Sequence, residues 1–487
     1  MNKNRLLFVL ALLVSTYLSV TLLHLGIDKF YYILVGGKKF ATFPDLRIQL
    51  GIGLSYVFIS ILYLIWIGKH FQDTPPAVTS RFRDVLKSAS PFLVLAFIAY
   101  PLGNDIYIYL HSGLMNLNRV NPFVVRAAAF STELSPYVDW GQTSTYGLVS
   151  QAIFTVSAAF VAVHPLVAVY VYKAICLALH TLNGFLIWKW LPHTERHRVA
   201  IAYLLHPLLL MEQVSSGHVD LLVSTSLIAF AISYAKWRYW TAFTALWMGL
   251  LAKTLPLIWV PLMAIAVLRR GQGKQLFRMI SASIAIVGVL TLTILPNVSA
   301  WRSLLNPGVE GQFQSSLLAI ARFLLDITRI FIAPEWLSFE TGQAILLGLV
   351  RLTILGFIGF YAWRLWRSDR YWDNTPQKLL EEMGWVTLVL LLIATPWLMP
   401  WYSSILITFA ALLPRARLFG LTSLAFGLSS SAQYVLASNS SIKSFVSIGL
   451  PIAVLIIGSW LLRRRSPTSE VVVTSTNDPL TSENSSL

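Results

Sequence analysis

The chain has 487 residues, of which 56% are hydrophobic and only 12% are charged, and its formal net charge is +16. A soluble globular protein carries about 25% charged residues, so this composition excludes a soluble globular class. The basic residues lie in short clusters between apolar runs rather than in one stripe. That distribution argues against nucleic acid as a partner and is typical of a membrane protein with positively charged cytoplasmic loops. The sequence therefore predicts an all-α polytopic membrane protein.

Apolar runs close to the length of a membrane span, about 20 residues, recur along the chain. The first run follows Lys3 and Arg5 and lacks a convincing cleavage site, so we interpret it as a retained span. We expect about 12–14 transmembrane helices in one domain, residues 1–462. The expected spans lie at about 6–25, 47–68, 88–103, 165–190, 199–214, 219–236, 239–252, 254–268, 275–296, 341–366, 382–398, 401–414, 416–436 and 444–462.

The loops between the expected spans differ in charge, and this difference orients the chain. Alternate loops hold basic clusters, at 69–87, 189–198, 269–278, 364–378, 415–417 and 463–465. Because basic loops stay in the cytoplasm, we expect both termini to be cytoplasmic in a plasma (inner) membrane. The basic loop at 28–47 disagrees with this orientation. The tail, 463–487, is rich in Ser and Thr and is expected to be disordered.

Two long loops fall on the opposite, non-cytoplasmic side. Residues 103–164 contain a weakly apolar stretch at 150–163, which could lie along the membrane interface rather than cross it. Residues 297–340 contain a similar stretch at 317–332. Long loops with helices of their own usually hold function, because rigid spans position them.

Asp105 stands near the start of the first long loop, a few residues beyond a span. A carboxylate at the membrane surface is partly desolvated yet reachable, which suits it to taking a proton. An Asp is also an ordinary start signal for a helix, here one that runs from residue 106 to 118. The local sequence favours the helix start.

The motifs around Asp105 resemble those of a known family. The first loop carries Asp105-x-Tyr107-x-Tyr109, then Gly113 and Asn121-Pro122-Phe123; further along come Tyr146-Gly147, His206-Pro207 through Gly217-His218-Val219-Asp220, Ala252-Lys253-Thr254-Leu255-Pro256, and Pro400-Trp401-Tyr402. In this order the segments resemble GT-C glycosyltransferases, most closely the polyprenol-phosphate-mannose-dependent mannosyltransferases. Leu148, Val219 and Phe123 depart from the usual pattern, which bears on the donor and acceptor more than on the reaction class.

The resemblance implies a GT-C-like bundle whose outer loops carry interfacial helices. It implies transfer of a sugar, mannose in this subset, from a polyprenyl phosphate to an acceptor hydroxyl with inversion, at a site on the non-cytoplasmic face. The partners would be the donor lipid, a glycolipid or glycan acceptor, and the bilayer. The acceptor must lose a proton, so Asp105 becomes the candidate general base. We expect no metal ion or other cofactor.

Lys253 is the candidate that meets the departing phosphate. A lone cation between two apolar segments is costly and usually functional, although a lysine that marks a helix end is an equal alternative. His218 and Asp220, at an expected outer turn, could bind phosphate or sugar, or Asp220 could simply cap a helix. Glu212 is a weaker candidate.

The remaining candidates are mostly aromatic. Trp401 and Tyr402 could stack on a sugar, but a membrane-interface belt is the favoured interpretation. Arg322 could bind phosphate or pair with Asp326 on its own helix face. The resemblance adds four residues to the expected donor site: Tyr107, Tyr109, Asn121 and Tyr146.

Two other classes of function remain open. A transporter or lipid flippase should show internal repeats and polar residues in mid-span, whereas the polar candidates here cluster at outer ends. A surface-polysaccharide polymerase or ligase should have Arg-rich outer loops, and these loops are only modestly basic. No cytoplasmic loop is long enough for a nucleotide-sugar domain, which favours a lipid-linked donor.

Overall fold

The computed structural model describes residues 3–36, 46–73, 81–138, 141–305, 312–332, 338–371, 375–437 and 440–465. Within these ranges the protein is helical, and its β-pairing amounts to one isolated bridge between Gln314 and Trp397. This confirms the predicted all-α class. Residues 466–487 of the expected tail, with parts of the loops at 28–47 and 297–340, lie outside the described residues.

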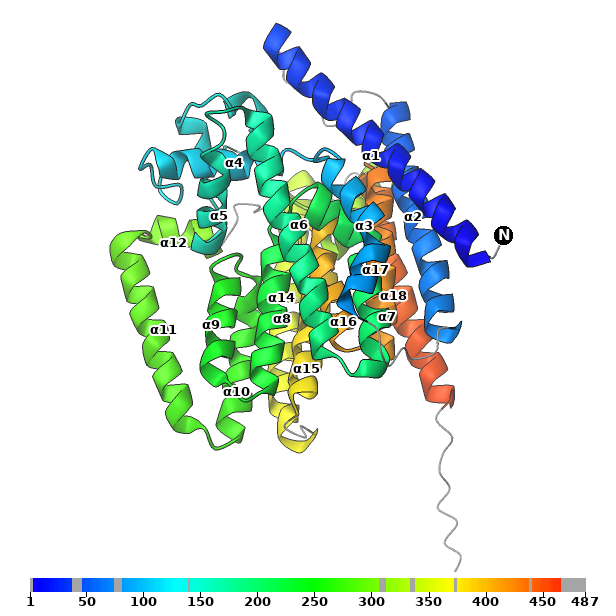
Figure 1. The fold of residues 1–487 in the computed structure, drawn as a ribbon. Helices are drawn as coiled ribbons and strands as arrows, with labels where there is room; N and C mark the ends of the chain where they lie inside the picture. Colours follow the sequence, from blue (N-terminus) through cyan, green and yellow to red (C-terminus); the bar gives the residue numbers. More distant parts are fainter. Residues whose placement is uncertain are drawn as a thin grey trace, which may run out of the picture.

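The described residues form helices α1 to α18, joined by short 3₁₀ and π segments (Figure 1). The first half holds α1 (Lys3–Gly36), α2 (Leu46–Asp73), α3 (Phe82–Ile98), α4 (Asp105–Leu117), α5 (Leu148–Ala158), α6 (Pro165–Trp190), α7 (His193–Leu204), the π segment η3 (Leu209–Ser215), α8 (Asp220–Ala235) and α9 (Tyr239–Leu250). The second half holds α10 (Val260–Arg269), α11 (Gly273–Thr293), α12 (Val298–Leu305), α13 (Leu317–Ile327), α14 (Phe339–Tyr371), α15 (Pro376–Val389), α16 (Ser404–Leu412), α17 (Arg417–Val435) and α18 (Ser440–Arg465).

Every span expected from the sequence contains a helix, but fewer helices are long enough to cross a bilayer. By length and composition six of the described helices qualify, α1, α2, α6, α11, α14 and α18, and the bent pair η3–α8 would make seven. The predicted 12–14 spans also counted shorter helices. A 12-residue helix such as α9 is only about 18 Å long, less than the ~30 Å hydrocarbon core.

The two ends of the bundle differ in what they carry. The α6–α7 turn, the α10–α11 turn and the end of α18 lie at the lower end in Figure 1, whereas α4, α5 and α12 lie at the upper end. The α8–α9 turn also belongs to the lower end, since the Arg270 guanidinium lies 3.1 Å from the centroid of the Trp237 ring. The basic clusters at 189–198, 269–278 and 463–465 therefore lie opposite the first long loop.

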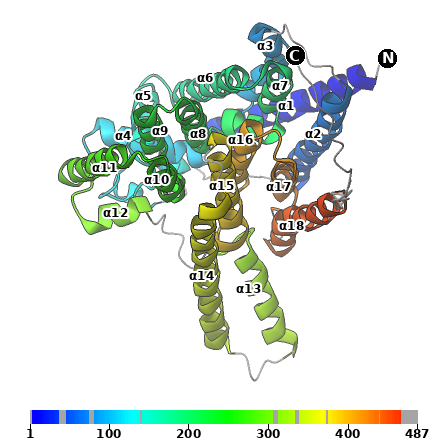
Figure 2. The same ribbon diagram turned by 90° about the horizontal axis from the view of Figure 1, so that it is seen from below.

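Helices α11, α13 and α14 project from the bundle (Figure 2) and bear apolar side chains on their exposed surfaces. On α11, Phe277 is 71% exposed and Leu292 85% exposed. Such exposure is costly in water but expected where helices face lipid tails. The first long loop packs differently, because α4 and α5 share a buried cluster with α6 and so form a compact cap at the upper end.

Candidate active site

A cavity of about 280 Å³ lies at the upper end of the bundle, between the cap and the transmembrane helices. Its wall includes five residues singled out from the sequence: Asp105, Tyr146, Lys253, Trp401 and Tyr402. They come from four separate segments of the chain. The fold thus brings an acid, a base and three aromatic rings to one cavity.

Asp105 is the first residue of α4, and its side chain is 29% exposed. The N-cap of α4 is Asn104, so Asp105 is not the cap that the sequence offered as an alternative. A carboxylate is still favoured at the positive end of a helix dipole, and the Asp105 side chain lines the cavity. Burial raises the pKa of Asp105, and the charges of His218 and Lys253 oppose that rise. A carboxylate in this setting holds a proton more readily than one in water.

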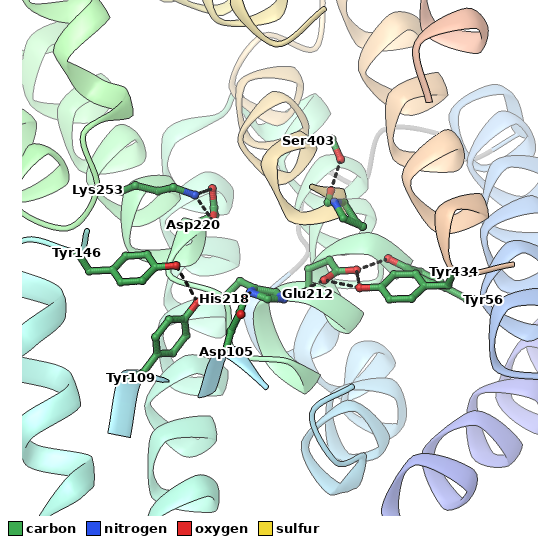
Figure 3. Close-up of polar contacts among 11 residues, drawn as sticks. Tyr56, Asp105, Tyr109, Tyr146, Glu212, His218, Asp220, Lys253, Ser403 and Tyr434 are labelled. Carbon is green, nitrogen blue, oxygen red and sulfur yellow. Dashed lines mark hydrogen bonds and ion pairs between the residues drawn. The ribbon is translucent and has the colours of Figure 1, made fainter. Parts of the chain in front are cut away.

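His218 owes its position to a break between η3 and α8, which meet at an angle of 108°. Gly217 in this break has a φ of +71°, and a Cβ there would lie 2.8 Å from the ring of Tyr172, so glycine is required. The turn stacks His218 on Trp401, with ring centroids 3.7 Å apart. It also brings Nδ1 of His218 to 3.4 Å from Oδ2 of Asp105 (Figure 3).

Lys253 and Asp220 form an ion pair at the cavity wall. The Lys253 ammonium donates to both Asp220 carboxylate oxygens at 2.9 Å and lies 4.2 Å from the centroid of the Tyr402 ring. Burial acts to lower the pKa of Lys253, but the Asp220 carboxylate outweighs it and the net pKa is raised. Lys253 is therefore a charged cation that faces the cavity.

Tyr146 and Lys253 are held together by backbone contacts between distant segments. The amide of Gly147 donates to the carbonyl of Ala252 at 3.3 Å, and the Ser150 hydroxyl donates to the same oxygen at 3.0 Å. A Cβ at Gly147 would lie 2.3 Å from the carbonyl oxygen of Leu251. Only glycine permits this approach, which explains why the Tyr-Gly and Ala-Lys motifs occur together.

Glu212 was only a weak candidate in the sequence, yet it lies at the centre of the buried polar network. Its carboxylate accepts from the Tyr434 hydroxyl at 3.0 Å and 3.2 Å and from the Tyr56 hydroxyl at 3.4 Å. Its Oε2 lies 3.3 Å from Nε2 of His218. The signal that could have ranked it higher is its place inside an apolar run, where an acidic residue is expensive.

Most of the site lies in a part of the chain that matches one family model. Residues 43–269 match the family model for the alpha-(1->6)-mannopyranosyltransferase N-terminal domain. The match covers just under half of the chain and contains Asp105, Glu212, His218 and Lys253, and it agrees with the resemblance seen in the motifs. It supports a membrane mannosyltransferase. No curated protein and no solved structure matched the chain.

Apart from His218 and Asp220, four residues of the expected donor site lie outside the cavity wall. Tyr107 is fully buried and stacks on Tyr137, with ring centroids 4.6 Å apart, and its hydroxyl contacts that of Tyr100. Asn121 ties the loop together, because its amide donates to the Ile294 carbonyl at 2.6 Å. The other two are Tyr109 and Arg322.

Tyr109 lies one layer behind the wall, with its hydroxyl 3.5 Å from that of Tyr146. Arg322, on α13, is 48% exposed, and its Nε lies 3.9 Å from Oδ2 of Asp326, the pairing that the sequence offered as an alternative. His218 and Asp220 are also behind the wall, in contact with Asp105 and Lys253 respectively. Across the described part of the chain, no three His, Cys, Asp or Glu side chains are grouped to hold a metal ion.

Proposed function

We propose that the protein transfers mannose from a polyprenyl-phosphate donor to a hydroxyl of a glycolipid or glycan acceptor, at a site on the non-cytoplasmic side of the membrane. The main support for this proposal is that the Asp105 carboxylate, the Lys253 ammonium and aromatic rings line one and the same cavity. The reaction needs one group that takes a proton and one that meets a phosphate.

The chemistry assigns a role to each charge. The acceptor oxygen attacks C1 of the sugar, the bond from C1 to the phosphate oxygen breaks, and the acceptor hydroxyl loses its proton. Asp105 is the proposed base, since its burial favours uptake of a proton. Lys253 is the proposed partner of the phosphate, because a fixed cation stabilises the charge that develops on the leaving group.

Three aromatic rings complete the proposed sugar site. Tyr146, Trp401 and Tyr402 share the cavity wall with Asp105 and Lys253. Trp401 already stacks on His218, and Tyr402 lies against the Lys253 ammonium, so both rings also hold charged or polar groups in place. This double role favours a functional interpretation over a simple interfacial belt.

A second cavity supports a lipid-linked donor. It has a volume of about 320 Å³, and apolar side chains of α9, α10, α11 and α12 line nearly all of it. Leu304 borders both cavities, and Leu251, in the wall of the second, lies two residues before Lys253. A phosphate held at Lys253 could thus extend its polyprenyl chain into an apolar cavity next to it, which a nucleotide would not need.

The charge distribution supports the proposed side. The cavity is lined in part by α4, and α4 lies at the end of the bundle opposite the turns that carry the basic clusters at 189–198 and 269–278 (Figure 1). Basic loops stay in the cytoplasm, so the cavity would open on the other face. A lipid-linked sugar that has crossed the membrane is the donor expected there.

The proposal is tested with purified protein in liposomes. We expect radiolabelled mannose to pass from polyprenyl-phosphate mannose to a mannosylated glycolipid, but not from GDP-mannose supplied in its place. The family name makes an α-(1→6) linkage the first product to look for. Transfer should survive EDTA. Movement of the intact donor between leaflets without a new glycosidic bond would support a flippase instead.

A further inference from the structure

The imidazole of His218 lies between two carboxylates that come from different elements. Nδ1 lies 3.4 Å from Oδ2 of Asp105, the first residue of α4, and Nε2 lies 3.3 Å from Oε2 of Glu212 in η3 (Figure 3). The side chains of His218 and Glu212 are 3% and 0% exposed. One ring face is occupied by Trp401, which holds the plane of the imidazole.

The hydrogen-bond contacts of His218 distinguish its two ring nitrogens. Nδ1 has no hydrogen-bond partner among the residues that the structure describes. A neutral imidazole has one N–H and one lone pair. If the N–H is on Nε2 and faces the Glu212 carboxylate, the lone pair of Nδ1 faces Asp105.

Glu212 is held in place from the other side. The hydroxyl groups of Tyr56 on α2 and Tyr434 on α17 both donate to its carboxylate. These bonds give both carboxylate oxygens of Glu212 a donor in a buried position, where an unpaired polar group would be costly. A Glu212 side chain held in this way presents an acceptor oxygen to Nε2 of His218, which favours the Nε2–H tautomer.

We propose that His218 accepts the catalytic proton from Asp105, and that Glu212 is a positioning residue that fixes the tautomer of His218 and balances the imidazolium. This inference rests on the proposed function, because it follows the proton that the acceptor hydroxyl loses. In catalytic triads, likewise, a carboxylate binds one nitrogen of a histidine while the other nitrogen accepts the proton. The orienting carboxylate is Glu212 rather than Asp220, which pairs with Lys253.

The proton and charge balance closes without any further reagent. As the acceptor oxygen bonds to C1, its proton passes to Oδ2 of Asp105, and the bond from C1 to the phosphate breaks. The proton then moves to Nδ1 of His218, so Asp105 is again a carboxylate and Glu212 faces an imidazolium. The product phosphate monoester, with a second pKa of about 6, can carry the proton away near neutral pH.

The neighbouring charges leave this path open. Lys253 and Asp220 bind each other, and Tyr402 lies over the Lys253 ammonium, so these groups act on the charge of Asp105 without occupying Nδ1 of His218. Tyr109 and Tyr146 contact each other beside Asp105. His218 is thus the base in contact with Asp105 on the buried side.

The test compares Glu212→Gln with a matched buried glutamate. Glu212→Gln should lower kcat on the order of 10²-fold, the usual contribution of a proton-transfer group, with KM little changed. Glu212→Asp should recover part of kcat. Glu382→Gln is the control, since Glu382 is also buried but pairs with Arg364 in the middle of α15. This control should keep the wild-type kcat.

A second variant gives a readout that a purely structural role would not move. His218→Gly should lose activity, and imidazole added to the medium should restore part of it. Wild-type kcat in Glu212→Gln, or no restoration by imidazole, would contradict the relay. If Glu212→Gln fails to fold, Glu212→Asp and the imidazole result decide.

The outcomes also separate this inference from the proposed function. If the wild-type protein transfers no mannose from polyprenyl-phosphate mannose, the proposed function is wrong. If it does, and Asp105→Asn is inactive while Glu212→Gln is fully active, only the relay is wrong.

Discussion

The ammonium of Lys253 lies 2.9 Å from each carboxylate oxygen of Asp220, and Lys253 borders the same cavity as Asp105. Asp220 is 3% exposed and Lys253 18% exposed. The lysine therefore reaches the cavity while its charge is anchored from behind. This places a cation at a fixed point where a phosphate could bind.

Loss of the Lys253 charge should affect stability and activity separately. Lys253→Met leaves the Asp220 carboxylate buried without its cation, which should destabilise the fold by about 3 kcal/mol. The double variant Lys253→Met/Asp220→Asn should recover most of the melting temperature but none of the donor affinity. Full recovery of transfer in the double variant would show that the pair has only a structural role. Thermal melting in detergent and KM for the donor are the measurements.

The raised pKa of Asp105 predicts an acidic limb in the pH–rate profile. Because the base must be ionised, kcat/KM should fall as the pH drops through a value above 3.8, the ordinary pKa of an Asp side chain. The raised pKa of Asp105 also determines how the stability of the fold changes with pH. A raised folded-state pKa gives stability that is complete below the unfolded pKa and is lost as the pH rises through the folded pKa.

Asp105→Asn removes the loss of folding stability that the ionised Asp105 carboxylate causes at neutral pH. The variant should therefore melt at the same temperature as the wild type, or higher, at pH 7, and the difference should shrink as the pH falls below 4. A variant that melts well below the wild type at pH 7 would contradict the assigned burial cost. The result also supplies the folding control for an inactive Asp105→Asn.

Gly147 should tolerate no side chain. Gly147→Ala places a Cβ 2.3 Å from the Leu251 carbonyl, which must push the Tyr146 segment away from Lys253, so transfer should fall sharply. Gly288, on α11, has nothing within 4 Å of the equivalent Cβ position. Gly288→Ala is the matched control and should change stability by no more than about 1 kcal/mol, in the stabilising direction. Equal effects of the two substitutions on transfer would contradict the packing argument.

Arg322 should be dispensable for catalysis. Its pairing with Asp326 is solvent-exposed, and such pairs contribute less than about 1 kcal/mol. Arg322→Ala should keep kcat and KM close to wild type. A large rise in donor KM would instead bring α13 into the donor site and favour the phosphate-binding interpretation of Arg322.

The sequence was sufficient for the helices and for the end of the bundle that holds the site. Apolar runs located a helix in every expected span, because burial in lipid demands them. The alternation of basic loops grouped Asp105, Lys253 and Trp401 at one end. The count of spans was less secure, since apolar composition does not say whether a short helix crosses the membrane.

Side-chain partners were harder to predict, for identifiable reasons. Tyr107 follows Asp105 by two residues and so lies on a different face of α4, whereas Tyr109 follows by four and shares the face; the motif treated both alike. Glu212 meets Tyr56 and Tyr434, which are 156 and 222 residues away in the chain. Such contacts depend on the tertiary fold, and no local pattern reveals them.

The central claim is that Asp105 is the base for mannose transfer from a lipid-linked donor, and one measurement tests it most directly. Wild-type protein and Asp105→Asn, reconstituted in parallel, are given radiolabelled polyprenyl-phosphate mannose and a glycolipid acceptor. The account predicts product from the wild type and a loss of at least about 10²-fold in kcat for an Asp105→Asn protein that melts normally. Near-normal transfer by the folded variant would contradict it.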